Sequence, residues 1–283
     1  MKKDYIFLHD DIQHGYTFMI KNVPQLGSRE NEFLMQCAST GKNIFSIGDV
    51  VAFWRSAHNA RIAIHRLVKK EWIRKIEKGK YVLIPFEAGK ARNWAVDSFL
   101  IAQALIHPAV IAYWSAMHHW NWTEQIPRIV YVQTTKRKSV KRKNVFGVEY
   151  EFVTVQKNKF YGQQPFWRGE TSLLITDKEK TLIDCADDPE RAGGIDELLK
   201  AIRVSAREID WVKLHAYARR FPNRAVMKRL GYLFEKEIQN LTPQSRKILE
   251  DWKTRLSNGI ALLQPDGRNT GRIVTRWRLR VNV

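Results

Sequence analysis

Apolar residues begin to recur at the spacing of an amphipathic helix near residue 28. Ser28 is a favourable N-cap residue, acidic residues follow it in the first turn, and Gly41 provides an end, so a helix is predicted between them. A second, shorter helix is predicted over about residues 47–54. After a tight turn, Ser56 can cap a third helix that ends near Lys70.

The third predicted helix has one apolar side and one polar side. Its apolar stripe, which is expected to pack against the first two helices, consists of Ala60, Ala63, Ile64, Leu67 and Val68. On the polar side Arg61 can bind guanine through two hydrogen bonds, Asn59 can pair with adenine, and Ile62 can contact a thymine methyl group. The candidate DNA-contacting residues here are Ser56, His58, Asn59, Arg61, Ile62, His65 and Lys69. When this helix is considered alone, an ordinary solvated face is an equal alternative.

The segment after the third helix has the pattern of a β-hairpin. Two short strands are predicted over residues 73–77 and 81–84, joined at Lys78 and Gly79, where glycine can adopt the positive φ of a tight turn. Three helices followed by a basic hairpin are typical of a winged helix-turn-helix. Such a wing presents cations to the DNA phosphate backbone, and the candidates are Arg74, Lys75, Lys78 and Lys80. A hairpin with a purely structural role is the alternative.

The middle of the chain alternates between helical and strand patterns. Helices are predicted over residues 97–106 and 109–120, and strands over residues 129–132 and 145–155. Aromatic side chains in the second of these helices lie at helical spacing, which favours packing in the core over base stacking.

A strongly basic segment lies between the two predicted strands. Residues 135–144 contain six cations and no acidic residue. The cations are Lys136, Arg137, Lys138, Lys141, Arg142 and Lys143. A loop of this kind repels itself and attracts phosphates or an acidic protein. A loop that is merely solvated is an equally good interpretation.

Residues 171–202 are rich in carboxylates. Paired carboxylates can hold Mg²⁺ for phosphodiester cleavage, so a metal-dependent nuclease is one alternative function. We favour a helix cap at Asp177 and a turn around Asp188 and Pro189. The sequence contains no zinc-protease, Walker-type or nucleophile-elbow motif. We therefore predict no catalytic residue, no metal site and no cofactor.

Two helices are predicted in the C-terminal third, over residues 209–219 and 224–238, and Gly231 in the second of them allows a neighbouring element to approach closely. Residues 273–283 alternate between apolar and polar positions, which predicts a final strand. Its polar face would carry a row of arginines, namely Arg276, Arg278 and Arg280. Such a row can bind DNA, RNA or an acidic protein, and an edge kept soluble by its charge is an equal alternative.

Composition sets the scale and the class of partner. With 283 residues, 44% of them hydrophobic, the chain can form two or three domains with a sizeable core. The net charge of +19 favours a polyanion such as nucleic acid, and +11 of it lies in residues 191–283, against +6 in residues 1–90. No membrane span or signal peptide is indicated, so we expect a cytoplasmic protein in which Cys37 and Cys185 are buried thiols.

Four segments together resemble a known family. They are the basic hairpin, AYWSAMHHWNWTEQIPRIVYVQTTKR (residues 112–137), ITDKEKTLIDCADDPERAGGIDELLKAI (residues 175–202) and NRAVMKRLGYLFE (residues 223–235). In this order they resemble the AbiEi antitoxin family of bacterial type IV toxin-antitoxin systems. The resemblance implies an N-terminal winged helix that represses the protein's own operon at inverted repeats. It also implies a C-terminal region that counters a nucleotidyltransferase-like toxin, without requiring a stable complex with it.

The predicted fold class is α+β. We expect an N-terminal extension (1–27), a winged helix-turn-helix DNA-binding domain (28–90) and an antitoxin domain (91–283). The antitoxin domain is expected to be mixed α/β to about residue 200, and then helical and basic, ending in a strand. Double-stranded DNA and a toxin are the predicted partners. Besides a nuclease, an RNA-binding protein that uses the basic segment and the arginine row is an alternative.

Overall fold

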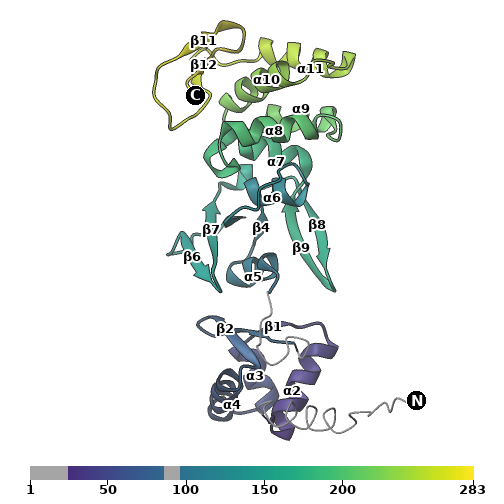
Figure 1. Ribbon diagram of the computed structural model, residues 1–283, viewed down its shortest axis with the longest axis vertical. Coiled ribbons are helices and arrows are strands. Elements are labelled where there is room, and N and C mark those ends of the chain that lie inside the picture. The colour runs from purple at the N-terminus through teal and green to yellow at the C-terminus, as the bar shows by residue number, and fades with distance from the viewer. Residues whose placement is uncertain (1–24, 86–95) are drawn as a thin grey trace, which may run out of the picture. The chain divides into compact units, whose positions relative to one another are not determined.

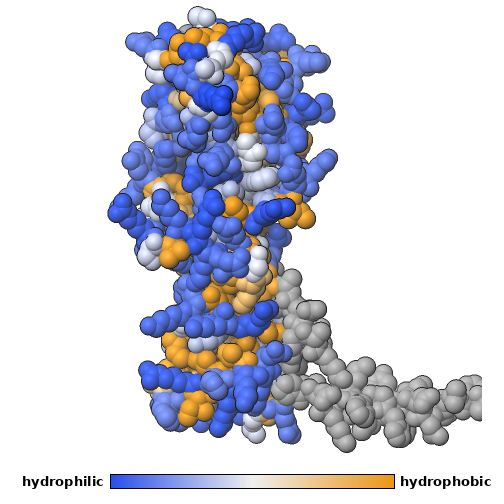
Figure 2. Space-filling view, turned by 60° about the vertical axis from the view of Figure 1, so that its left-hand side comes forward, coloured by the Kyte–Doolittle hydropathy of each residue, from blue (hydrophilic) through white to orange (hydrophobic). Residues whose placement is uncertain are grey.

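The computed structural model describes residues 25–85 and 96–283. The chain divides into two compact units between residues 96 and 97, and we call them unit 1 and unit 2. Most of the expected N-terminal extension and the linker after Pro85 lie outside the described residues. Figure 1 shows the elements of each unit. In the face seen in Figure 2, small apolar patches interrupt a mostly hydrophilic surface.

Within residues 25–85, unit 1 contains three helices and a three-stranded antiparallel sheet with the order β1-β3-β2. The elements are α2 (Ser28–Ser39), β1 (Ile44–Ser46), α3 (Ile47–Trp54), α4 (Ala57–Lys69), β2 (Ile73–Glu77) and β3 (Lys80–Leu83). The three predicted helices and the hairpin are confirmed, and α3 and α4 form a helix-turn-helix-like pair. The short strand β1, which extends the hairpin to three strands, was not predicted.

The start of the first helix differs by one residue from the prediction. Gly27 occupies the N-cap position and Ser28 is already helical. Glu30 explains the difference, because its carboxylate accepts a hydrogen bond from the Gly27 N–H at 3.0 Å and so binds the helix end itself. Lys70 at the end of α4 pairs with the same carboxylate at 2.7 Å. The start of α2 is thereby tied to the end of α4.

The core of unit 1 is aromatic at its centre. The ring of Phe33 on α2 lies 5.1–5.3 Å from the rings of Phe45, Phe53 and Trp54, in edge-on geometry. From α4 the core receives Ala60, Ala63, Ile64 and Leu67. Val68 was assigned to this stripe, but it is 39% exposed. It follows Leu67 by 100° around the helix, which carries it past the edge of the buried side.

Unit 2 is built on a six-stranded mixed sheet with the order β6-β7-β5-β4-β9-β8. Its strands are β4 (Val110–Ile111), β5 (Ile129–Thr134), β6 (Arg142–Val145), β7 (Val148–Thr154), β8 (Gln163–Arg168) and β9 (Thr171–Thr176). The pairs β5–β7 and β4–β9 are parallel, and the other neighbours are antiparallel. Helix α5 (Ser98–Leu105), which was predicted, contacts β4, β5 and β9.

Two predictions in this sheet are corrected. The predicted helix over residues 109–120 begins as strand β4, which pairs with both β5 and β9, and only then becomes α6 (Tyr113–His119). Because β4 is short and forms hydrogen bonds with a strand on each side, this pairing outweighs the helical pattern of its sequence. The predicted strand over residues 145–155 is interrupted at Phe146 and Gly147, both with positive φ. The chain turns there, so β6 and β7 form an antiparallel hairpin.

Helices form the core of unit 2. They are α6, α7 (Lys178–Asp187), α8 (Ile195–Ser205), α9 (Trp211–Arg220), α10 (Ala225–Glu237) and α11 (Pro243–Thr254). Helices α7 and α10 are buried along most of their length and contact each other. The predicted helices over residues 209–219 and 224–238 are confirmed as α9 and α10, whereas α11 was not predicted. The cysteine prediction is also confirmed, because Cys37 and Cys185 are buried free thiols.

The single terminal strand is a wrong prediction. The chain forms β10 (Ala261–Leu262), β11 (Arg272–Val274), a 3₁₀ turn η4 (Thr275–Trp277) and β12 (Leu279–Val281), in a sheet of order β10-β12-β11. Strands β11 and β12 are antiparallel, so the chain reverses within the segment that was predicted to be straight. Trp277, in the turn, is fully buried and its ring packs against Gly231 of α10, which provides the close approach that the sequence predicted.

Candidate nucleic-acid interface

Helix α4 is fixed so that its predicted contact residues face outward. Ser56 caps the helix, since its Oγ accepts a hydrogen bond from the Asn59 N–H at 3.3 Å. Ala60 and Leu67 have no exposed surface, and their burial sets the rotation of the helix. The exposed residues on the opposite side are His58, Asn59, Arg61, Ile62, His65 and Lys69. Arg66 is exposed on α4 as well, although it is not among the predicted contact residues.

The first turn of α4 differs electrostatically from those of α2 and α3. Glu30 lies in the first turn of α2 and Asp49 in that of α3, whereas α4 has no acidic residue there. The positive end of the α4 dipole is therefore not neutralised by its own side chains. This end of the helix favours the approach of anionic groups.

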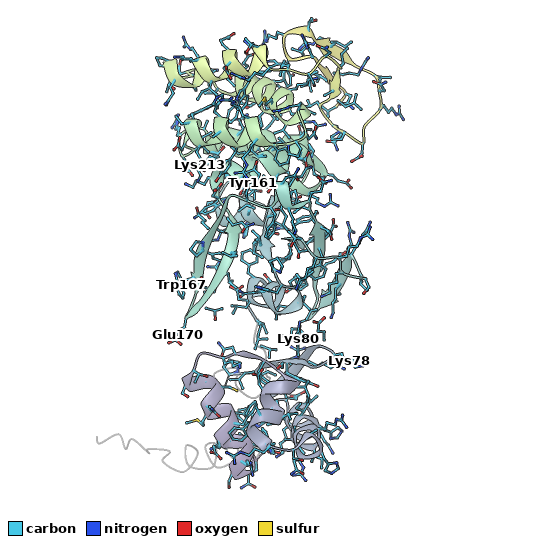
Figure 3. The ribbon with its side chains drawn as sticks, turned by 180° about the vertical axis from the view of Figure 1, so that it is seen from behind. Lys78, Lys80, Tyr161, Trp167, Glu170 and Lys213 are labelled. Carbon is cyan, nitrogen blue, oxygen red and sulfur yellow. The ribbon has the colours of Figure 1, made fainter. Side chains whose placement is uncertain are left out.

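The β2–β3 hairpin presents basic side chains from a rigid base. Gly79 adopts φ +77° at its turn, and the Gly79 carbonyl accepts a hydrogen bond from the Ile47 N–H at 2.7 Å, which ties the hairpin to the start of α3. Arg74, Lys75 and Lys78 are exposed. Lys80 is only partly exposed and pairs with Glu77 at 2.9 Å. Figure 3 shows Lys78 and Lys80 on this hairpin.

The basic segment at residues 135–144 is less free than predicted. Part of it is strand β6, in which Arg142 pairs with Glu151 at 2.8 Å and lies 3.5 Å from Glu149. The Lys138 ammonium donates to the Leu105 carbonyl at 2.6 Å and lies 4.3 Å from the centre of the Phe152 ring. Lys136, Arg137 and Lys141 are exposed, and Lys143 is partly buried. The six cations therefore do not act as one solvated loop.

The arginine row does not exist as one face. Arg276 pairs with Glu235 at 2.7 Å. Arg278 lies beyond the turn, with φ +46°, and donates to the Leu256 carbonyl and to Asn258 Oδ1, both at 3.0 Å. Arg280 donates to the Gly271 carbonyl at 3.3 Å. The reversal of the chain separates the three side chains, and each one bonds to a different part of the C-terminal region.

The carboxylates of residues 171–202 have structural partners. Asp177 caps α7 through the Lys180 N–H at 2.8 Å, which confirms the predicted cap, and accepts a hydrogen bond from the Tyr217 hydroxyl at 2.9 Å. Lys213 bridges Asp177 and Glu179, at 3.1 and 2.9 Å. The predicted turn is confirmed too, as Asp188 caps a short 3₁₀ helix, η3 (Pro189–Ala192). Across residues 25–85 and 96–283, no three His, Cys, Asp or Glu side chains are grouped as metal ligands.

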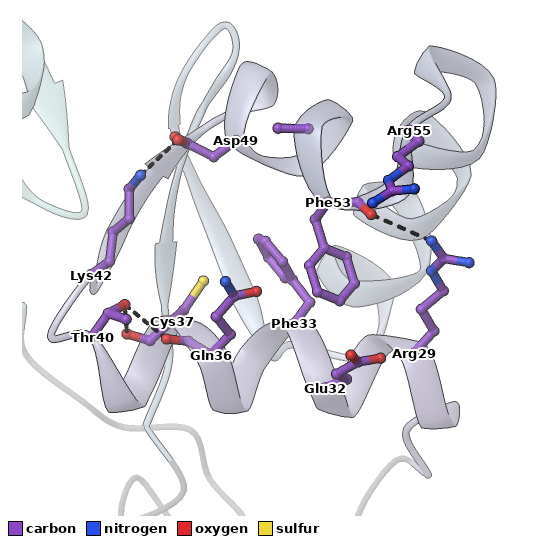
Figure 4. Close-up of a pocket in the computed structure, with 11 residues that line it drawn as sticks. Arg29, Glu32, Phe33, Gln36, Cys37, Thr40, Lys42, Asp49, Phe53 and Arg55 are labelled. Atoms are coloured by element: carbon purple, nitrogen blue, oxygen red, sulfur yellow. Dashed lines mark hydrogen bonds and ion pairs between the residues drawn. The ribbon is translucent and has the colours of Figure 1, made fainter.

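A groove of about 550 Å³, which was not predicted, runs between α2 and α3 (Figure 4). Phe33, Cys37 and Phe53 are among its apolar lining residues. At one end Lys42 pairs with Asp49 at 2.6 Å. At the other end lie two arginines, Arg29 and Arg55. The groove forms only when α2 packs across α3, so no local sequence pattern reports it.

Comparisons with known proteins give one solved structure of similar fold and one family model over the N-terminal segment. No curated protein matches the chain. The crystal structure of the RV2827C protein from Mycobacterium tuberculosis is similar in fold, with a TM-score of 0.65 and 13% sequence identity over 91% of this chain and 92% of that one. None of the helices in the described part of the chain is long and apolar enough to cross a membrane. Residues 32–84, from within α2 to just past β3, match the family model described as "Transcriptional regulator, AbiEi antitoxin", which confirms the resemblance for this segment.

Proposed function

We propose that this protein is a cytoplasmic antitoxin and autorepressing transcriptional regulator. Unit 1 binds inverted-repeat promoter DNA as a winged helix-turn-helix, and unit 2 counters a nucleotidyltransferase-like toxin without requiring a stable complex. The observation that carries the proposal is the combination, in one family-matched segment, of an outward polar face on α4 and a basic hairpin after it. The proposal includes no enzymatic activity, because the candidate carboxylates serve as caps and ion-pair partners.

The two elements have different tasks on DNA. A helix inserted into the major groove reaches base edges, and Arg61 can bind guanine through two hydrogen bonds while Asn59 pairs with adenine. The hairpin cations at Arg74, Lys75 and Lys78 neutralise phosphates, which fixes the position of the protein on the duplex without reading sequence. Lys80 contributes less, since its charge is shared with Glu77.

Arg61→Ala is expected to weaken binding to the cognate repeat by about 1–3 kcal/mol and to relax the preference at one base pair. The measurement is a fluorescence-anisotropy titration with cognate and single-substituted duplexes. Arg246→Ala removes the same charge from an exposed position on α11 of unit 2 and serves as the matched control. Equal affinity of the wild-type protein for cognate and scrambled duplexes would contradict sequence-specific binding.

Lys78→Ala is expected to lower affinity by the same factor for cognate and scrambled duplexes. A lysine that contacts phosphate releases a counterion on binding, so its loss also reduces the slope of log K against log salt by about 1. Titrations at several salt concentrations measure both effects. A loss confined to the cognate duplex would instead assign Lys78 to base recognition.

The antitoxin half of the proposal has its own test. Expression of a nucleotidyltransferase, where one is encoded beside this protein, should inhibit growth, and co-expression of this protein should restore it. Growth that stays inhibited in the presence of the wild-type protein would leave the DNA-binding half standing and remove the antitoxin half.

A further inference from the structure

The groove between α2 and α3 has two arginines, Arg29 and Arg55, at one end. Arg29 lies in the first turn of α2, and Arg55 directly follows α3. The Arg29 guanidinium donates to the Phe53 carbonyl at 3.4 Å and lies 5.8 Å from the centre of the Phe53 ring. Figure 4 shows the Arg55 side chain at the same end of the groove as Arg29. Within residues 25–85, neither arginine forms an ion pair with a carboxylate.

The cation at the opposite end of the groove is neutralised, unlike the two arginines. There Lys42 is neutralised by Asp49, which also accepts a hydrogen bond from the Ser46 N–H at 2.7 Å. The groove therefore has one end with a closed ion pair and one end with two positive charges. Glu32 also lines the groove, but it pairs with neither arginine.

Both arginines occupy positions where an arginine does not help the fold. Arg29 places a cation near the positive end of the α2 dipole, an unfavourable arrangement of a few tenths of a kcal/mol. Arg55 has φ +52°, the left-handed region that favours glycine or asparagine. Other non-glycine residues of this chain share that backbone conformation, so it is not diagnostic by itself. Two cations at the same end of the groove, at positions that do not favour the fold and without an ion-pair partner in residues 25–85, are better explained by a ligand than by stability.

We infer that Arg29 and Arg55 form a binding site for one phosphate of the DNA backbone, beside the start of α4. This inference rests on the proposed function and adds a contact to it. A guanidinium presents parallel N–H donors that match two phosphate oxygens, and a pair of them can hold one phosphate from two sides. Packing on Phe53 limits the freedom of Arg29 before binding. Arg55 immediately precedes Ser56, the cap of α4, so the bound phosphate fixes the depth of that helix in the major groove.

The test uses substitutions that the fold should tolerate. Arg55→Gly relieves the left-handed backbone position, and Arg29→Gln removes the cation from the start of α2. Neither variant should lower the thermal midpoint followed by circular dichroism. Arg55→Asn, which also tolerates positive φ, is a second variant in case glycine loosens the turn. Lys42→Gln, at the neutralised end of the same groove, is the matched control.

We expect each arginine variant of the full-length protein to bind both cognate and scrambled duplexes about tenfold more weakly and to reduce the salt slope by about 1. Because both side chains hold one phosphate, the double variant should reduce the slope by about 1 as well, not by 2. Lys42→Gln should bind like the wild-type protein. A slope reduced by 2 in the double variant overturns the shared phosphate.

Two further outcomes separate this inference from the proposed function. Wild-type protein that binds neither duplex overturns the proposed function and the phosphate site with it. Wild-type protein that binds DNA, together with arginine variants that bind equally well, overturns the phosphate site alone. A titration with inorganic phosphate in the absence of DNA is the remaining measurement. If the arginine variants lose phosphate binding but keep wild-type affinity for DNA, the site binds a free anion. That result overturns the contact with the DNA backbone.

Discussion

Replacing Lys180 by methionine is expected to destabilise unit 2 by about 3–5 kcal/mol, because it leaves a buried carboxylate without its cation. Lys180 has no exposed surface, and its ammonium pairs with Asp184 one turn further along α7, whose side chain is 3% exposed. The rings of Tyr161 and Phe221 lie 5.1 and 5.6 Å from the ammonium. Methionine fits between these rings, so packing is largely kept and the lost charge dominates the effect.

The pH dependence of this variant identifies the cause. Burial raises the pKa of Asp184 above its ordinary 3.8, and Lys180 opposes that rise. Without Lys180 the folded carboxyl keeps its proton to higher pH, whereas the unfolded carboxyl loses it near pH 4. Above that pH the unfolded state binds fewer protons, so stability falls as pH rises. Urea unfolding of the variant between pH 4 and pH 7 should show this decline more steeply than the wild-type protein does.

The double variant Lys180→Met/Asp184→Asn is the control for that prediction. Asparagine has nearly the shape of aspartate and carries no charge, so the double variant should recover a large part of the lost stability and lose the added pH dependence. A double variant as unstable as the single one would show that Lys180 acts through its shape and not through its charge. Both residues lie in the segment that carries the family resemblance, and their buried pair gives them a role in the folding of α7.

The elements of unit 1 could be predicted from sequence because their signals are local. Ser56 caps α4 and Gly79 makes the hairpin turn, and each of these features depends on a few neighbouring residues. The apolar period of α4 is equally local, which explains why only its edge residue Val68 was misplaced. The contact candidates on α4 followed directly, since the outward side of a helix is fixed once its buried side is known.

The errors in unit 2 arise where distant segments decide the outcome. Residues 110 and 111 become a strand because β5 and β9 pair with them on both sides, a fact that no local pattern contains. Apolar and polar residues do alternate along residues 273–283. However, the ring of Trp277 packs against Gly231, and the chain turns at that residue instead of continuing as a strand. Because of that turn, Arg276, Arg278 and Arg280 do not lie on one face of a strand.

The two-arginine end of the groove was missed for the same reason. Arg29 and Arg55 are 26 positions apart and line the same groove only after α2 packs across α3. The sequence did contain one weak signal, a cation in the first turn of a helix, where acidic residues are favoured. Arg66 could have been found more easily, because it lies on the exposed side of a helix already assigned to DNA.

Trp277→Ala is expected to cost about 3–5 kcal/mol, since the indole is fully buried and its removal leaves a cavity above α10. The indole N–H also donates to Glu235 at 2.7 Å, but Lys253 and Arg276 remain as partners of that carboxylate. The loss should therefore come mainly from packing. Urea unfolding followed by far-UV circular dichroism measures it without relying on the fluorescence of the deleted residue.

Gly231→Ala should change the stability of the protein in opposite directions with and without the Trp277 ring. A Cβ at residue 231 would collide with the ring carbons of Trp277, so in the wild-type protein the substitution should destabilise by about 1–3 kcal/mol through overpacking. In the Trp277→Ala background the ring is absent, and the same methyl group should stabilise α10 by up to about 1 kcal/mol through helix propensity and partial filling of the cavity. Destabilisation of equal size in both backgrounds would place the requirement for glycine in the α10 backbone and not in the approach of Trp277.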